Sequence, residues 1–382
     1  MKIFIVVISF FALLLSWQEA VAWGGRGHHT LCDAATFVVQ EKELRQFLTS
    51  RPHTMGHLCN IPDIAWRSLP GEMTKEGNPG HFFDWEIIGG TVKDFPLDYK
   101  KIIADFEGKK KANEEGLIRS IPHEFGSLWW RADQFYRRAL VGKETLAASA
   151  LGATVAATEK ADKKEKSEKE KAEKKKEESD DSAFNKAVYE FYVNLGIMGH
   201  FVGDNAQPLH TTSDYDGYGK GHGGIHGYYE DVMLSAMDGD LQFKVMKEAR
   251  KMRSAERKEK FLVEKTLLEK MRALSVASNA DIDLILKADL LKKPSEQAEE
   301  RGMKIRKPAE REPIEKTKAK FEPLLVKHLA RGVALLSLLW DEAYREAGSP
   351  KLSTYKSFKY PLVPEFVYPD YYEIKKDESA KK

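Results

Sequence analysis

The segment of residues 184–204 constrains the fold more than any other part of the chain. Its apolar side chains recur at the spacing of one helix face, and Pro208 ends the pattern. A second long apolar helix is predicted over residues 324–347, whereas the alternation typical of strands is rare. The sequence therefore predicts an all-α fold with a single mainly helical domain over residues 23–350.

Residues 1–22 have the features of a secretory signal peptide. Lys2 precedes a nearly unbroken apolar run, and Ala20-Val21-Ala22 has the form of a cleavage site. We expect cleavage between Ala22 and Trp23, which makes the mature protein secreted or periplasmic. The run is too short to cross a bilayer, and no later window is expected to approach the ~20 apolar residues that a membrane helix needs. We therefore expect no stable membrane anchor, and a monomer.

The charge of the whole chain is nearly balanced. Among 382 residues, 61 basic and 59 acidic side chains give a formal net charge of +2. This balance excludes a general electrostatic attraction to nucleic acid or to anionic lipid, so any polyanion site must be local.

Three segments differ in composition from the rest. Residues 146–182 form a polar, Lys/Glu-rich insert with almost nothing to bury, which predicts either a disordered segment or a solvated helix with ion pairs. Residues 293–313 are expected to be a loose region next to charged helices. Residues 351–382 form a tail rich in Tyr and Pro that is expected to wrap the surface.

The strongest local motif is His200-Phe-Val-Gly-Asp204-Asn-Ala-Gln-Pro-Leu-His210. Residues four apart share a helix face, so His200 and Asp204 point at one volume, and the chain can turn back toward it after the proline. His226 and Glu230 repeat the four-residue spacing on a second predicted helix. Imidazole nitrogens and carboxylate oxygens are ligands that zinc prefers, so the joint pattern predicts a metal site.

Several residues near these motifs compete for the same roles. His222 is an alternative to His226 because it lies in a flexible Gly-rich loop, and His29 adjoins His28. Asp231 lies off the face of His226, which favours Glu230. The other histidines are expected to be ordinary surface or core residues: His53, His57, His123 and His328. Trp129 and Trp130 are expected to be helix core.

The chain resembles the zinc-dependent S1/P1 nucleases and their relatives, the trinuclear-zinc phospholipases C. The resemblance runs in family order from Trp23 to Glu230 and is interrupted by the polar insert. The shared motifs in this sequence are Trp23-Gly-Gly-Arg-Gly-His28, Asp63 in Pro62-Asp63-Ile64-Ala65-Trp66, His81-Phe82-Phe83-Asp84, His200 through His210, and His226 with Glu230. The resemblance implies the helical fold of the phospholipase C/P1 nuclease type.

The resemblance also implies three Zn²⁺ ions and their ligands. One ion would be held by Asp63, His81, His200 and Asp204; a second by His210, His226 and Glu230; the third by the amine and carbonyl of Trp23 with His28 and Asp204. The free amine at Trp23 would exist only after signal cleavage. Amine and imidazole ligands bind in their deprotonated forms, so binding would weaken in acid.

The implied activity is hydrolysis of a phosphate ester by a metal-activated water, without an amino-acid nucleophile. Asp63 and Asp204 would be the catalytic carboxylates. Phe82 would stack a nucleobase and Asp84 would bind its edge, although Phe82 and Phe83 have the alternative of simply packing the loop. Cys32 and Cys59 are either a disulfide or two buried thiols.

Three positions depart from the nuclease pattern. Glu230 stands where nucleases usually have Asp and phospholipases C have Glu. The D-R-G-G-N segment of the nucleases after His210 is absent, which puts the substrate preference in doubt. Trp66 stands where some nucleases have an Arg, and Arg67 would replace it only if the loop shifts.

These features support three functional hypotheses. The leading one is an exported endonuclease that cleaves RNA and single-stranded DNA, with 3′-mononucleotides as further substrates. The alternative is a phospholipase C whose substrate is phospholipid. The third is a non-catalytic, metal-stabilised secreted helical protein.

Overall fold

The computed structural model describes residues 23–373, apart from 52, 107–111, 114–115, 118–122, 151–181, 255, 257–258, 301–302 and 358. The predicted signal peptide, most of the predicted insert and the last nine residues of the tail lie outside the described residues. The described chain confirms the all-α prediction, because it forms a mainly helical single body with 66% helix, 4% strand and 13 helices.

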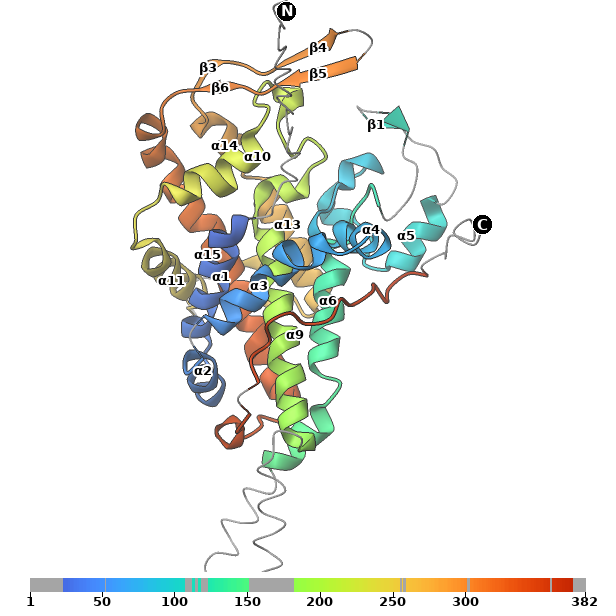
Figure 1. Cartoon of the computed structure of the whole chain (residues 1–382), viewed down its shortest axis with the longest axis vertical. Helices are drawn as coiled ribbons and strands as arrows, with labels where there is room; N and C mark the ends of the chain where they lie inside the picture. Colours follow the sequence, from blue (N-terminus) through green and yellow to red (C-terminus); the bar gives the residue numbers. More distant parts are fainter. Residues whose placement is uncertain are drawn as a thin grey trace, which may run out of the picture.

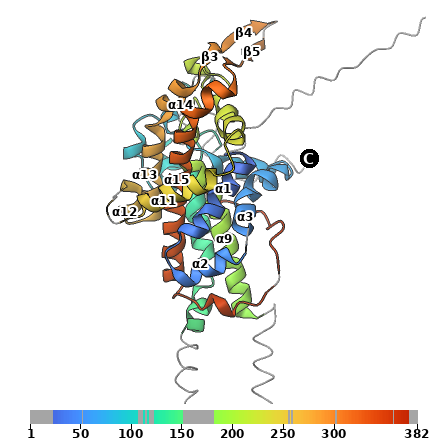
Figure 2. The same cartoon turned by 90° about the vertical axis from the view of Figure 1, so that its left-hand side faces the viewer.

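The elements follow one another in a long series of helices (Figures 1 and 2). The helices are α1 (Gly24–Val38), α2 (Lys42–Thr49), α3 (Thr54–Ile64), α4 (Glu72–Gly77), α5 (Tyr99–Phe106), α6 (Leu128–Ala139), α9 (Ala183–Ala206), α10 (Ile225–Gly227), α11 (Leu241–Met252), α12 (Lys260–Val263), α13 (Leu267–Asn279), α14 (Ile282–Ala288) and α15 (Ile314–Glu346). Short 3-10 turns are η1 (Trp66–Ser68), η2 (Asn78–His81), η3 (Trp85–Ile87), η4 (Val92–Asp94), η5 (Pro208–Thr211), η6 (Tyr218–Lys220) and η8 (Leu352–Thr354), while η7 (Tyr228–Met233) is a π-helix. The strands are β1 (Ala112–Asn113), β2 (Gly116–Leu117), β3 (Leu291–Lys293), β4 (Glu296–Glu300), β5 (Met303–Lys307) and β6 (Glu310–Arg311).

Helix α9 runs through the centre of the body and packs against α3, α6 and α15 (Figure 1). The hydroxyl of Ser182 accepts a hydrogen bond from the backbone N–H of Asn185 and caps its first turn. Every residue from Phe191 to Ala206 is buried. A helix enclosed on all sides carries its polar residues into the interior, so the motif at its C-terminal end is necessarily a buried site.

Two glycines of α9 allow the helices around it to approach closely. A Cβ at Gly199 would collide with the sulfur of Cys32 on α1, and a Cβ at Gly203 would lie 3.1 Å from Nδ1 of His28. Both close approaches are possible only because glycine has no side chain. The glycine within His200-Phe-Val-Gly-Asp204 therefore has a packing role, because it admits the imidazole of His28 beside Asp204.

Helix α15 differs from one expectation. In the described part of the chain it is the one helix that is long and apolar enough to cross a membrane, although 67% of its most apolar window is buried inside the protein. It packs against α1, α9 and α11. The expectation that no segment after residue 22 reaches such apolarity is therefore wrong, and the physical reason is that a core helix surrounded by other helices is apolar on most of its faces.

The region predicted to be loose contains two antiparallel strand pairs instead. Strand β3 pairs with β6, and β4 pairs with β5 in a hairpin at one end of the body (Figure 2). The register places Glu296 opposite Lys307. Opposite charges across a strand pair stabilise it without an apolar face. The sequence of these strands therefore lacks the alternation of apolar and polar residues by which a strand is predicted.

The tail packs along the helical body. The carbonyl of Pro364 accepts a hydrogen bond from the indole of Trp66, and the carbonyl of Val367 accepts one from Arg131. The hydroxyl of Tyr372 donates to Glu76. These contacts agree with a tail that wraps the surface, and they bring it beside α4, α6 and η1.

Candidate metal centre

The centre begins on α9, where His200 and Asp204 are both fully buried. Nε2 of His200 lies 3.2 Å from Oδ2 of Asp204. The other ring nitrogen, Nδ1, lies 2.8 Å from the carbonyl of Cys59 and must donate to it, because a carbonyl only accepts. That bond leaves Nε2 as the ring nitrogen free to bind a metal.

Three further segments bring ligands to the same place: α1 carries His28, α3 carries Asp63 and η2 carries His81. Oδ1 of Asp204 lies 3.2 Å from Nε2 of His28, and Oδ2 lies 3.2 Å from Nδ1 of His81. Asp63 lies 3.5 Å from His81 and 3.8 Å from His200. The two oxygens of Asp204 thus face different imidazoles, which is the arrangement that a bridging carboxylate requires.

A second group lies on the loop and the helix that follow α9. Nε2 of His226 lies 2.8 Å from Oε2 of Glu230 and 3.0 Å from Nε2 of His210. Nδ1 of His210 donates to the carbonyl of His81, so the second group is tied to the first. The helix predicted here begins as α10 and continues as the π-helix η7, a rare conformation that is frequent at functional sites.

Trp23 lies at the edge of both groups and is fully buried. Its backbone nitrogen is 3.1 Å from Oε2 of Glu230, and its indole donates to the carbonyl of Gly203. Its carbonyl accepts a hydrogen bond from the N–H of Gly27 as the first bond of α1. The structure therefore unites His28 with Asp204, as the third predicted ligand set requires, but directs the nitrogen of Trp23 toward the second group.

The donor atoms of the first group fit a metal ion. Among the described residues, Nε2 of His28, both carboxylate oxygens of Asp63 and Oδ1 of Asp204 are buried without a hydrogen-bond partner. Buried carboxylates without hydrogen bonds are costly, and divalent cations bound by the triads of this group would satisfy these atoms. Three triads can hold a metal here: His28, His200 and Asp204; Asp63, His81 and His200; His210, His226 and Glu230.

Metal ligands must be neutral imidazoles and ionised carboxylates, and the electrostatics of the first group favours these states at most of its residues. Burial and the neighbouring His200 lower the pKa of His28, and burial together with Arg67 lowers the pKa of His81 to about 3. Burial alone would raise the pKa of Asp204, but its imidazole neighbours, His200 foremost, hold it well below its usual range. Asp204 in turn raises the pKa of His200 against the effect of burial. The first group therefore combines neutral imidazoles at His28 and His81 with an ionised carboxylate at Asp204.

Neighbouring charges also shift the pKa values of the second group. Burial opposes ionisation of Glu230, but His226 and His210 outweigh it and lower the pKa of Glu230 to about 2. Glu230 raises the pKa of His210 against the effect of burial. The carboxylate of this group is thus ionised at neutral pH.

Two residues that contact the carboxylates of the centre, Gln207 and Arg67, were not assigned this role from the sequence. Gln207 is fully buried, and its amide donates to Oε2 of Glu230, which orients that carboxylate. Nε of Arg67 lies 3.1 Å from Oδ1 of Asp63 without any shift of the loop, because η1, which carries Arg67, follows the end of α3 after a single residue. The four-residue spacing was the signal that could have found this arginine.

The competing residues lie elsewhere. Nδ1 of His222 lies 2.9 Å from Oδ2 of Asp289, and His222 belongs to none of the three triads. Among the other histidines, His328 is buried between Asp281 and the hydroxyl of Tyr229. Trp129 and Trp130 are buried in the core, as expected. His29 and His53 lie together with Asp33 in a separate cluster.

Phe82 and Asp84, the two residues predicted to bind a base, lie in the segment that follows His81, on either side of Phe83. Phe83 is fully buried and packs edge-on against Phe95 and Phe125, whereas the extended backbone turns Phe82 the other way and leaves it half-buried. No aromatic ring of the described chain packs against Phe82. Burial, with Glu86 nearby, raises the pKa of Asp84 well above its usual range.

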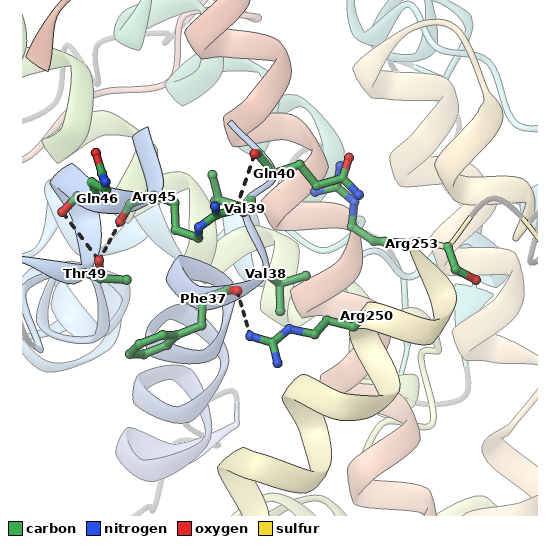
Figure 3. A pocket seen from close by; sticks show the side chains of 10 residues that line it. Phe37, Val38, Val39, Gln40, Arg45, Gln46, Thr49, Arg250 and Arg253 are labelled. Atoms are coloured by element: carbon green, nitrogen blue, oxygen red, sulfur yellow. Dashed lines mark hydrogen bonds between the residues drawn. The ribbon is translucent and has the colours of Figure 1, made fainter. Parts of the chain in front are cut away.

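A pocket lies away from this centre, between α1, α2 and α11 (Figure 3). It has a volume of about 640 Å³, but its arginines serve the fold. Arg45 donates to the carbonyl of Val39, Arg250 donates to that of Phe37, and Arg253 pairs with Asp341. A much narrower crevice borders the centre and is lined by residues that include Arg67, His81, Arg131, Phe201 and Phe366.

Cys32 and Cys59 form a disulfide that joins α1 to α3. The structure thus selects one of the two alternatives that the sequence left open. A disulfide is typical of extracellular proteins and agrees with export of the chain. The chain matches no model of a known protein family, and no curated protein sequence matches it significantly.

Proposed function

We propose that the protein is an exported zinc-dependent phosphodiesterase of the S1/P1 nuclease type that hydrolyses RNA and single-stranded DNA, and also 3′-mononucleotides. The observation that carries this proposal is the convergence of His28, Asp63, His81 and the His200/Asp204 pair in one buried cluster. These residues come from four separate segments and include carboxylate oxygens without hydrogen bonds. The motif resemblance predicts the same set.

Zinc ions held there would supply Lewis acidity, which brings the pKa of a bound water toward neutrality and neutralises charge developing on a phosphate ester. The protein groups prepare this chemistry. Asp204 offers its two oxygens to different imidazoles, and the carbonyl of Cys59 holds His200 in one tautomer. Arg67, beside Asp63, adds a local positive charge that attracts a phosphate anion although the net charge of the chain is nearly zero.

Phe82 supports a nucleic-acid substrate. An aromatic face next to the metal ligands accepts any base by stacking, which suits cleavage with little sequence preference. The half-buried Phe82 lacks an aromatic partner within the described chain, in contrast to Phe83. Glu230 favours the second candidate, a phospholipase C, because that branch has Glu at this position.

The decisive experiment incubates the mature protein with single-stranded DNA, RNA and phosphatidylcholine vesicles, with and without a chelator. We expect nucleotide release that the chelator abolishes. Lipid turnover without nucleotide release would reject the nuclease proposal in favour of the phospholipase. No turnover of any substrate by zinc-loaded protein would favour the non-catalytic hypothesis.

Substitution of Phe82 tests whether this residue binds the base of the substrate and not its phosphate. Phe82→Ala is expected to raise KM for single-stranded DNA by about tenfold, because stacking on an aromatic ring is worth ~1–3 kcal/mol per base. Hydrolysis of a small phosphodiester without a base should not change. Phe37→Ala is the matched control, since Phe37 is 43% exposed and lies in the remote pocket. Equal effects of both substitutions would remove Phe82 from the substrate site.

A further inference from the structure

A second cluster of metal-binding residues lies at the surface, where α1 and α3 pack together, and takes no part in the buried centre. It consists of His29 and Asp33, one turn apart on α1, and His53, which precedes α3. The side chains of His29 and His53 are 40% and 72% exposed, and that of Asp33 is 10% exposed. The cluster is therefore open to solvent on the side of the imidazoles.

Three ligand atoms of this cluster form a small triangle. Oδ2 of Asp33 lies 3.2 Å from Nε2 of His29 and 2.9 Å from Nδ1 of His53, and the two nitrogens are 3.1 Å apart. Zinc bonds of about 2.0–2.1 Å in tetrahedral geometry place neighbouring ligand atoms about 3.3 Å apart. The triangle thus matches one face of such a tetrahedron to within a few tenths of an ångström.

Hydrogen bonds account poorly for a triangle of this kind. Each ring nitrogen carries at most one hydrogen, which can point at only one of the other two corners. One pair of atoms therefore remains in close contact without a well-directed hydrogen bond. A cation above the triangle would satisfy all three atoms together.

The surroundings of the cluster hold its members in place. The backbone N–H of Gly56 donates to Oδ1 of Asp33, which leaves Oδ2 for the imidazoles. A Cβ at Gly56 would lie 2.7 Å from Nδ1 of His29, so the glycine provides the space in which that ring lies. This support by a neighbouring backbone is what metal ligands commonly have.

His53 is held in a strained backbone conformation. Its φ of 62° lies in the left-handed region, which residues other than glycine rarely adopt. Such strain persists where the surrounding structure requires it and occurs often at binding sites. Here it brings an exposed imidazole back toward Asp33 on a different helix.

We propose that His29, Asp33 and His53 form a surface site for a divalent transition metal of the zinc class, with at least one coordination position open to solvent. The metal would join α1 to α3, the same two helices that the Cys32–Cys59 disulfide joins. This site is independent of the buried centre and of the proposed activity.

The test measures zinc binding to the mature protein and locates the ion in crystals. In zinc-soaked crystals, anomalous difference maps recorded above and below the zinc absorption edge should show a peak about 2 Å from the three ligand atoms. In solution, His53→Ala should bind one equivalent of zinc less than the unaltered protein. Gly56→Ala should weaken the same binding event at least tenfold, because its methyl group displaces His29.

His57→Gln is the matched control. His57 follows Gly56 on α3 and donates to carbonyls of the tail, a bond that a glutamine amide can replace. This control should bind as much zinc as the unaltered protein. The proposal is overturned if His53→Ala binds the same number of ions with the same affinity, or if the maps show no peak at the cluster. Because the readout is a difference between variants, loss of the buried metals or of all activity would not affect it.

Discussion

Removal of the Cys32–Cys59 disulfide offers the sharpest quantitative test of how the centre is held together. The cross-link closes a loop with a sequence separation of 27. In the chain-entropy model, a loop of that length restricts the unfolded chain by about 3.5 kcal/mol at 25 °C. We therefore expect reduction of the disulfide to lower the free energy of unfolding by about that amount.

The structure suggests how to separate the cross-link from the packing of the sulfurs. Both cysteines are fully buried, and Gly199 packs directly on the sulfur of Cys32. The reduced wild-type protein keeps the volume of both sulfurs, whereas the double variant Cys32→Ala/Cys59→Ala also loses them and leaves a small cavity. The variant should therefore be less stable than the reduced protein by about 1 kcal/mol.

Equilibrium unfolding in urea measures both differences, with oxidised, reduced and double-variant protein at equal metal loading. The slopes with urea should be compared together with the midpoints, because the cross-link also makes the unfolded state more compact. If reduction changes the free energy of unfolding by less than about 1 kcal/mol, the disulfide does not act through the closed loop, and the reasoning fails.

Three further predictions concern single residues. Asp204→Asn should lose bound metal and thermal stability together, because the two oxygens of Asp204 face different imidazoles. Unchanged metal content by elemental analysis would contradict the bridging role. The control is Asp231→Asn, which changes the carboxylate one residue after Glu230. Burial lowers the pKa of His328 to about 4 from 6.5, so its neutral form stabilises the fold above pH 6.5 and this stability is lost as the pH falls toward 4. Urea unfolding at pH 6.5 and pH 5 should show a loss that is about 2 kcal/mol larger in the unaltered protein than in His328→Gln, and equal losses in both proteins would refute the assignment to His328. One extra residue before Trp23 should reduce metal content and phosphodiesterase activity, because Trp23 is fully buried with its nitrogen 3.1 Å from Glu230; full activity of such a protein would exclude a ligand role for the amine.

The helices were largely predictable because helical periodicity is a local property. The burial of the C-terminal parts of α9 and α15 follows from apolar residues on most of their faces there. The strand pairs at 291–311 were not predictable in this way, because an acidic strand facing a basic one has no apolar face to reveal it. The π-helix at Glu230 was also hidden, since His226 and Glu230 keep the same four-residue spacing in either kind of helix.

The ligands of the centre were also predictable where they lie close together in the sequence. The pairs His200/Asp204 and His226/Glu230 each lie within one turn, so spacing alone brings their side chains together. The choice between His226 and His222 was not local. It depends on Asp289 and Arg311, which lie far along the chain and bind to the Gly-rich loop at His222.

By itself, the sequence determined which residues can bind a metal and which of them share a helix turn, because both are set by residue type and by a fixed helical pitch. Only the tertiary structure decided that His28, Asp63 and His81 meet Asp204, since this depends on how closely α1 and α3 approach the glycines of α9. The same approach of α1 to α3 created the surface cluster at His29, Asp33 and His53. Contacts between distant segments arise from packing, and no periodicity along the chain records them.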